Sequence, residues 1–156
     1  MRERRYLPLL WWMVVTVACT SPQGLDPVNK TGAGVAVRGY DPVAYFTENK
    51  PVPGHDRHQH SWNGARWYFA NAENLDAFVK DPERYAPRYG GYCAYAVSHG
   101  YTADGDPQVW KIVDGRLYLN YNRDAQQAWE EDIPGNIAKG NENWPGFLKR
   151  KPEHKG

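Results

Sequence analysis

One cysteine and a cluster of three histidines are the residues of this chain best suited to chemistry. Cys93 lies in a stretch rich in glycine and tyrosine, and a thiolate is a strong nucleophile and a soft metal ligand. His55, His58 and His60 are close together, and His58 and His60 face the same side if they lie in a strand. Imidazoles on one face and a thiolate together suit copper or zinc. The four residues predict a mixed nitrogen and sulfur site if the histidine segment folds against the segment around Cys93.

Cys93 has two further interpretations. A free cysteine is often a small buried residue that only packs, which predicts an inert structural thiol. A thiol-dependent enzyme would need a base, for which His60 or His99 is available, and an orienting carboxylate from Asp104 or Asp106. The chain has no C-x-x-C pair, no phosphate-binding glycine loop and no H-E-x-x-H motif. The sequence therefore favours a non-catalytic role over an enzyme.

Aromatic rings near Cys93 predict a second kind of site. The chain has seven Trp, eleven Tyr and four Phe, and such rings give a large contact area at little entropic cost. The residues that would line a groove for a small molecule are Tyr89, Tyr92, Tyr95 and His99, with Tyr85, Tyr101, Trp62, Trp67 and Trp110 as further candidates. The alternative is that these rings fill the core of a small domain.

Two β-hairpins are predicted around the dipeptides Asn63-Gly64 and Asp114-Gly115. Such dipeptides favour tight hairpin turns, because both central positions of these turns need a positive φ. The flanking strands are expected over residues 58–62 and 65–70 for the first hairpin, and over residues 109–113 and 116–121 for the second.

Short helices are predicted between and after the hairpins. They are expected over residues 41–47, 72–80, 92–99 and 123–132, with a weaker candidate at 136–139. Asn71 can cap the second of these helices. In the third, Cys93 shares a face with Ala96 and Val97, which favours its burial. In the fourth, Trp129 is expected to point inward.

Residues 1–18 have the composition of an export signal. Three arginines and one glutamate in residues 1–5 precede an apolar run over residues 7–18, which is shorter than the about 20 apolar residues needed to cross a bilayer. Small residues before Cys19 resemble a bacterial lipobox, in which this cysteine becomes the acylated first residue. Thr16 departs from the aliphatic residue typical of that motif, so cleavage that releases a soluble protein is the alternative.

Composition and charge suit one domain outside the cytoplasm. The chain of 156 residues has a formal net charge of +1, and removal of the leader leaves it close to neutral. There is no basic patch to indicate nucleic-acid binding. No internal repeat and no low-complexity tract are expected.

Several blocks in order resemble an exported branch of the YHS-domain proteins. They are residues 39–46 (Gly-Tyr-Asp-Pro-Val-Ala-Tyr-Phe), 67–70 (Trp-Tyr-Phe-Ala), 78–85, 89–94 and 114–120 (Asp-Gly-Arg-Leu-Tyr-Leu-Asn), within about residues 37–148. The resemblance implies metal binding through cysteines. Those cysteines correspond here to Ala44, Ala70 and Asn74. Because alanine cannot coordinate a metal, the family's site is not carried over to these positions.

Together these features predict an α+β fold, a small single domain of two β-hairpins packed with several short helices. Residues 1–18 are expected to be a signal peptide, 19–32 a lipid-anchored or flexible tether, 33–148 the YHS-like domain and 149–156 a basic tail. The expected protein is a lipoprotein of the cell envelope or periplasm, anchored at Cys19, that binds copper, zinc or a small molecule near Cys93. A structural or interaction domain with an inert Cys93 is the alternative, and a thiol-dependent enzyme comes third.

Overall fold

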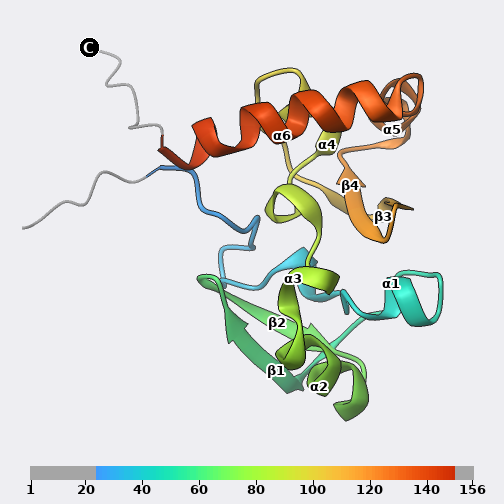
Figure 1. Ribbon diagram of the computed structural model, residues 1–156. Helices are drawn as coiled ribbons and strands as arrows, with labels where there is room; N and C mark the ends of the chain where they lie inside the picture. Colours follow the sequence, from blue (N-terminus) through green and yellow to red (C-terminus); the bar gives the residue numbers. More distant parts are fainter. Residues whose placement is uncertain (1–23, 150–156) are drawn as a thin grey trace, which may run out of the picture.

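A computed structural model describes residues 24–149 as two β-hairpins, each accompanied by short helices, with a long helix across one end (Figure 1). The elements in chain order are η1 (Val37–Gly39), α1 (Ala44–Thr47), β1 (His55–Trp62), β2 (Ala65–Phe69), α2 (Ala72–Lys80), α3 (Pro82–Tyr85), η2 (Arg88–Gly91), α4 (Ala94–Ser98), β3 (Asp106–Val113), β4 (Arg116–Asn120), α5 (Arg123–Glu130) and α6 (Ile133–Lys149). This arrangement confirms the α+β fold class.

Both predicted hairpins are confirmed. β1 pairs with β2 and β3 pairs with β4, each in antiparallel orientation. The turn residues adopt positive φ, with 51° at Asn63, 78° at Gly64, 49° at Asp114 and 72° at Gly115. The turn dipeptides therefore act as their chemistry predicts.

The two hairpins belong to two copies of one structural unit, contrary to the expectation of no internal repeat. Each copy consists of a short helix, a hairpin and a second helix. The first repeat, residues 39–80, contains α1, β1, β2 and α2, and the second repeat, residues 91–130, contains α4, β3, β4 and α5. In Figure 1 the hairpin of the first repeat lies in the lower half of the molecule and that of the second repeat in the upper half.

Strand pairing and helix capping are the same in both repeats. Each hairpin has an irregularity between its two outermost pairs, which are His55–Phe69 and Gln59–Tyr68 in the first repeat and Asp106–Asn120 and Trp110–Leu119 in the second. The side-chain oxygen of Asn71 accepts a hydrogen bond from the Asn74 amide at 2.8 Å and caps α2. Asn122 caps α5 through the Ala125 amide, also at 2.8 Å.

The start of each repeat is fixed in the same way. The amide of Asp41 donates to the Val52 oxygen at 2.8 Å, and the amide of Cys93 donates to the Ala103 oxygen at 2.8 Å. Each of these residues follows a Gly-Tyr dipeptide. Cys93 therefore occupies in the second repeat the place that Asp41 occupies in the first.

The predicted helices are confirmed in position, with small differences at their ends. Cys93, Ala96 and Val97 are each at most 1% exposed, as their common face predicts, and Trp129 is fully buried. Most of the aromatic residues in the interior belong to two clusters. The first contains Trp67, Phe69 and Phe78, and the second contains Tyr89, Tyr118, Trp129 and Phe147.

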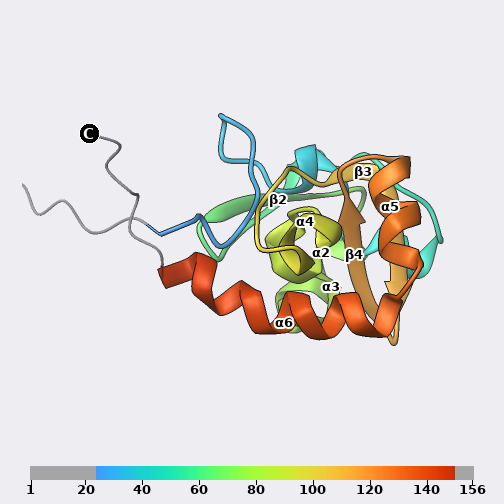
Figure 2. The ribbon, with the colours of Figure 1, turned by 90° about the horizontal axis from the view of Figure 1, so that it is seen from above.

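Residues 24–32 pack against the domain, so this part of the predicted tether is not free. Val28 is 1% exposed and belongs to the first core cluster. The Leu25 amide donates to the Phe147 oxygen at 3.2 Å, and Figure 2 shows the N-terminal segment meeting the end of α6. The predicted signal peptide, Cys19 and residues 150–156 lie outside the described residues.

Helix α6 is longer than the weak candidate in the sequence. It runs over Ile133–Lys149 although it contains Gly140 and Pro145, which are poor helix formers. A Cβ atom at Gly140 would overlap the Tyr89 ring, whose hydroxyl donates to Asn141 Oδ1 at 3.1 Å. Packing against Tyr89 thus overrides local propensity. None of the helices in the described part of the chain is long and apolar enough to cross a bilayer.

Candidate functional site

The start of the first repeat is built around a buried carboxylate. Asp41 is 0% exposed. Its Oδ1 atom accepts hydrogen bonds from the amides of Val43 at 2.8 Å and Ala44 at 3.3 Å. Its Oδ2 atom accepts from the Ala70 amide at 2.9 Å and from Asn74 Nδ2 at 2.7 Å. One side chain thereby joins α1, the end of β2 and α2.

The positions at which the resemblance implies metal ligands converge on this carboxylate. Ala44, Ala70 and Asn74 each donate one of the hydrogen bonds to Asp41. Two of the three side chains are methyl groups, and the Asn74 amide nitrogen is a donor rather than a metal ligand here. These three residues therefore do not fit a metal ion. The Asp41 carboxylate occupies the space between them and accepts their hydrogen bonds.

The corresponding place in the second repeat has a different chemistry. Cys93 is 1% exposed, and its thiol donates to Asn120 Oδ1 at 3.6 Å. The same oxygen accepts from the Tyr95 amide at 3.0 Å. Tyr95 corresponds to Val43, whose amide donates to Asp41 in the first repeat. In the second repeat, Asn120 therefore accepts the backbone hydrogen bond that Asp41 accepts in the first, and the Cys93 side chain does not accept it.

A cavity of about 450 Å³ lies over Cys93. We call it the Cys93 pocket, and its walls are Cys93, Tyr95, Ala96, Tyr101, Ala103, Tyr121, Asn122, Asp124, Ala125 and Ala128. Ala96, Tyr121 and Ala125 stand where Ala44, Ala70 and Asn74 stand in the first repeat. In the first repeat, Asp41 and its hydrogen bonds fill the equivalent position, whereas in the second repeat this position is a cavity.

The rim of the Cys93 pocket is aromatic and exposed. Tyr101 is 50% exposed and Tyr121 is 56% exposed, although large rings are usually buried. Burial, and then the neighbouring Cys93, raise the pKa of Tyr101 above its ordinary value. Asp124 is the one acidic or basic side chain in the lining. This environment suits an apolar group that is neutral or positively charged.

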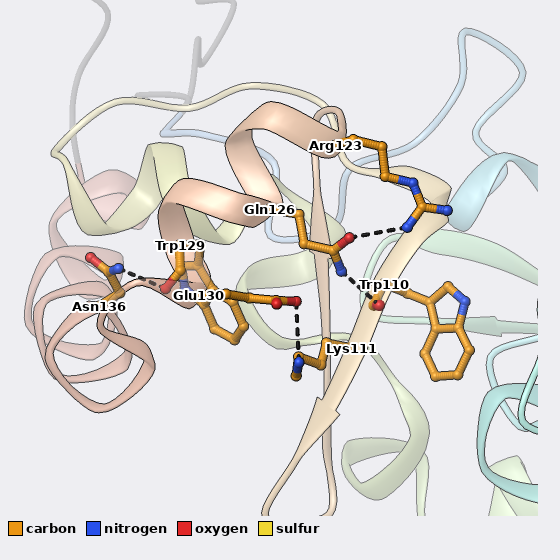
Figure 3. Close-up of polar contacts among 7 residues, drawn as sticks. All are labelled: Trp110, Lys111, Arg123, Gln126, Trp129, Glu130 and Asn136. Carbon is orange, nitrogen blue, oxygen red and sulfur yellow. Dashed lines mark hydrogen bonds and ion pairs between the residues drawn. The ribbon is translucent and has the colours of Figure 1, made fainter.

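Polar contacts hold α5, which forms one wall of the pocket, against β3 (Figure 3). Gln126 Nε2 donates to the Trp110 oxygen at 2.9 Å, and the Glu130 carboxylate pairs with Lys111 at 3.2 Å. At the far end of the helix, Asn136 Nδ2 donates to the Trp129 oxygen at 2.9 Å. The wall is therefore held by contacts on the other side of the helix from the pocket residues Ala125 and Ala128.

The structure does not bring the three histidines of β1 to Cys93. His58 and His60 share the half-buried face of β1, as strand periodicity predicts, whereas His55 is exposed. β1 packs against β2 and α2, where the rings of His60 and Phe78 have centroids 6.4 Å apart. Cys93 packs against β4 in the other half of the molecule (Figure 1). Within residues 24–149, no group of three or more His, Cys, Asp or Glu residues could hold a metal ion.

The predicted ligand-lining residues are divided among different places. Tyr95 lines the Cys93 pocket, and its ring stacks on that of exposed His99 with centroids 4.1 Å apart. Tyr89 lines a separate cleft, and Tyr92 packs against Trp144. The wall residues Tyr121, Asp124, Ala125 and Ala128 were not among the candidates, because only folding places α5 beside Cys93.

Among the described residues, no basic side chain forms a hydrogen bond with the Cys93 thiol. The side-chain hydrogen bond of Cys93 goes to Asn120. His99 Nδ1 instead lies 2.9 Å from the Ser98 hydroxyl and 2.9 Å from the Tyr95 oxygen. The geometry therefore supplies no nucleophile and base pair of the kind that a thiol enzyme needs.

Comparison with known proteins gives one match. Residues 43–89 match the family model of the YHS domain. This range covers α1, both strands of the first hairpin, α2 and α3, and it includes Ala44, Ala70 and Asn74. No curated protein and no solved structure matches the chain. The similarity to the YHS domain therefore lies in the first repeat and α3.

Proposed function

We propose that this protein is a non-catalytic binding protein whose ligand occupies the Cys93 pocket. The ligand is a small molecule with an apolar body that is neutral or carries a positive charge. The observation that supports this function is the contrast between the repeats. The same place is closed by Asp41 and its four hydrogen bonds in the first repeat, and it is open over Cys93 in the second.

The size and lining of the pocket support a small ligand. Its volume of about 450 Å³ lies in the range of roughly 300–1,000 Å³ that is common for small-molecule sites. Alanines and tyrosines form most of the walls, and tyrosine gives apolar contact while its hydroxyl stays in water. The carboxylate of Asp124 would repel an anion and attract a cation.

Metal binding is the alternative that the family suggests. The described residues place one thiol and the Asp124 carboxylate around the Cys93 pocket, which is fewer ligands than a copper or zinc site normally has. We therefore favour an organic ligand over a metal ion. Metal loading serves as a separate outcome in the test below.

The neutral fluorescent probe N-phenyl-1-naphthylamine tests the site. We expect saturable binding of one probe per chain. Ala128→Trp should weaken this binding at least tenfold, because the indole occupies the pocket without replacing Cys93. Ala125→Leu is a second, smaller pocket-filling change. Ala138→Trp, at an exposed position of α6, is the matched control and should leave the affinity unchanged.

Two results would contradict this function. The first is probe binding that is not saturable, or that is the same in Ala128→Trp as in the unchanged protein. The second is stoichiometric copper or zinc retained by the unchanged protein and lost in Cys93→Ser, which would favour the metal alternative. A thiol inert to all reagents together with no probe binding would instead support a structural Cys93.

We also propose that the protein is exported and anchored to the cell envelope by lipid on Cys19. The support is the basic and apolar leader, followed by small residues and the cysteine. Mass spectrometry of the mature N-terminus should find Cys19 as the first residue, carrying acyl chains. Cys19→Ser should abolish the lipid and release the protein from the membrane fraction. An unmodified first residue other than Cys19 would contradict the anchor.

A further inference from the structure

A second cavity lies where the two repeats and α6 meet. Its volume is about 500 Å³. Trp62 at the end of β1, Arg88 in η2, Arg116 at the start of β4 and Trp144 in α6 all line it. We call this cavity the junction cleft. Ligand sites are often found at such junctions, because no single element fills them.

The junction cleft carries unbalanced positive charge. Burial raises the pKa of Tyr118, and the nearby side chains of Arg88 and Arg116 lower it, so both guanidinium groups lie near this hydroxyl. Neither arginine takes part in the ion pairs found within residues 24–149. Glu83 also lines the cleft, but Arg116 contacts its backbone oxygen, at 3.5 Å, rather than its carboxylate. Two guanidinium groups are therefore available to an anion.

The walls of the junction cleft also offer two half-buried indoles. Trp62 packs against Trp67 and Phe78, with centroids 5.8 Å apart in each case. Trp144 packs against Tyr89 and Tyr92, with centroids 5.9 Å apart in each case. These neighbours hold the indoles in place. Each indole therefore presents its remaining surface to the cleft at little cost in entropy.

We propose that the junction cleft binds a small aromatic carboxylate. The carboxylate group pairs with Arg88 and Arg116, because guanidinium groups match the geometry of carboxylate oxygens. The ring of the ligand packs against Trp62 and Trp144. This site differs from the Cys93 pocket in the sign of its charge, since the charged residue there is Asp124. The two sites select different ligands.

Titration of the unchanged protein with 1-naphthoate, followed by NMR of the indole N–H signals, tests the proposal. We expect saturable shifts of the Trp62 and Trp144 signals and smaller changes at Trp129, which lies outside the cleft. The cation 1-naphthylmethylammonium should produce no saturable shift at these signals. Ala128→Trp should leave the binding of 1-naphthoate unchanged, which separates this site from the Cys93 pocket.

The arginine variants give the deciding comparison. Arg88→Gln and Arg116→Gln should each raise the Kd for 1-naphthoate at least tenfold, since each change removes a charge-assisted hydrogen bond to the carboxylate. Arg57→Gln, at an exposed position of β1, is the control and should leave the Kd unchanged. Arg116 is exposed, so its variant decides the matter if Arg88→Gln does not fold. Equal binding of the anion and the cation, or an unchanged Kd in Arg116→Gln, would overturn the proposal.

Discussion

Asp41→Ala is expected to remove a large part of the stability of the fold. The change leaves four donors around a buried place without an acceptor, namely the amides of Val43, Ala44 and Ala70 and the Nδ2 group of Asn74. Each buried donor left without an acceptor costs about 1–3 kcal/mol, so the four together cost several kcal/mol. That is a large part of the about 5–15 kcal/mol by which a domain is stable. Urea denaturation of the variant and the unchanged protein measures the loss.

Two further variants make the Asp41 experiment specific. Asp76→Ala removes an exposed carboxylate from α2 and should change the free energy of unfolding by no more than about 0.5 kcal/mol. Asp41→Asn keeps one acceptor oxygen but places an NH2 group opposite two of the hydrogen-bond donors. It should therefore lower the free energy of unfolding without creating a cavity. A free energy of unfolding within about 1 kcal/mol of the unchanged protein for Asp41→Ala would refute the structural role of this carboxylate.

Alkaline pH is expected to destabilise the protein through two buried tyrosines. Tyr45 is fully buried, and its hydroxyl donates to the Pro107 oxygen at 2.8 Å. Burial is the main reason that the pKa of Tyr45 lies far above its ordinary value, and burial raises the pKa of Tyr89 in the same way. The folded state therefore keeps protons that the unfolded state loses above about pH 10. Stability is fully present below that pH and falls as pH rises above it.

The pH profile of unfolding measures this effect. Each of the two tyrosines should lower the free energy of unfolding by about 1.4 kcal/mol per pH unit above pH 10. Tyr45→Phe should reduce the slope by one such contribution, and it should cost about 1 kcal/mol at neutral pH through its lost hydrogen bond. Tyr121→Phe, which removes a hydroxyl already exposed to water, is the matched control. Parallel profiles for Tyr45→Phe and the unchanged protein would contradict the assignment.

Local chemistry explains why much of the fold is predictable from the sequence. Asn63-Gly64 and Asp114-Gly115 adopt the positive φ values that their turns require. Asn71 caps α2 as expected. These features depend on residues that are neighbours in the chain. By contrast, the low helix propensities of Gly140 and Pro145 disfavour a helix over α6. Only the contact with the distant Tyr89 explains why position 140 needs a glycine.

The repeat is harder to detect, because the two copies preserve geometry rather than residue identity. Two signals in the sequence reveal it: both turn dipeptides are followed at the same spacing by a capping asparagine, Asn71 or Asn122, and a Gly-Tyr dipeptide precedes both Asp41 and Cys93. At the site itself, Asp41 in one copy corresponds to Cys93 in the other. Sequence alone indicates that Cys93 is buried, but not that α5 builds a cavity beside it. The histidine cluster is misleading because β1 packs on the helix of its own repeat.

Chemical modification of Cys93 tests the central claim, that the pocket over this residue is the ligand site. The full chain is treated with methyl methanethiosulfonate, with and without saturating N-phenyl-1-naphthylamine, and the peptide that contains Cys93 is quantified by mass spectrometry. We predict slow modification, because Cys93 is 1% exposed, and at least tenfold slower modification when the probe is bound. A bound probe that leaves the rate of Cys93 modification unchanged would contradict the claim.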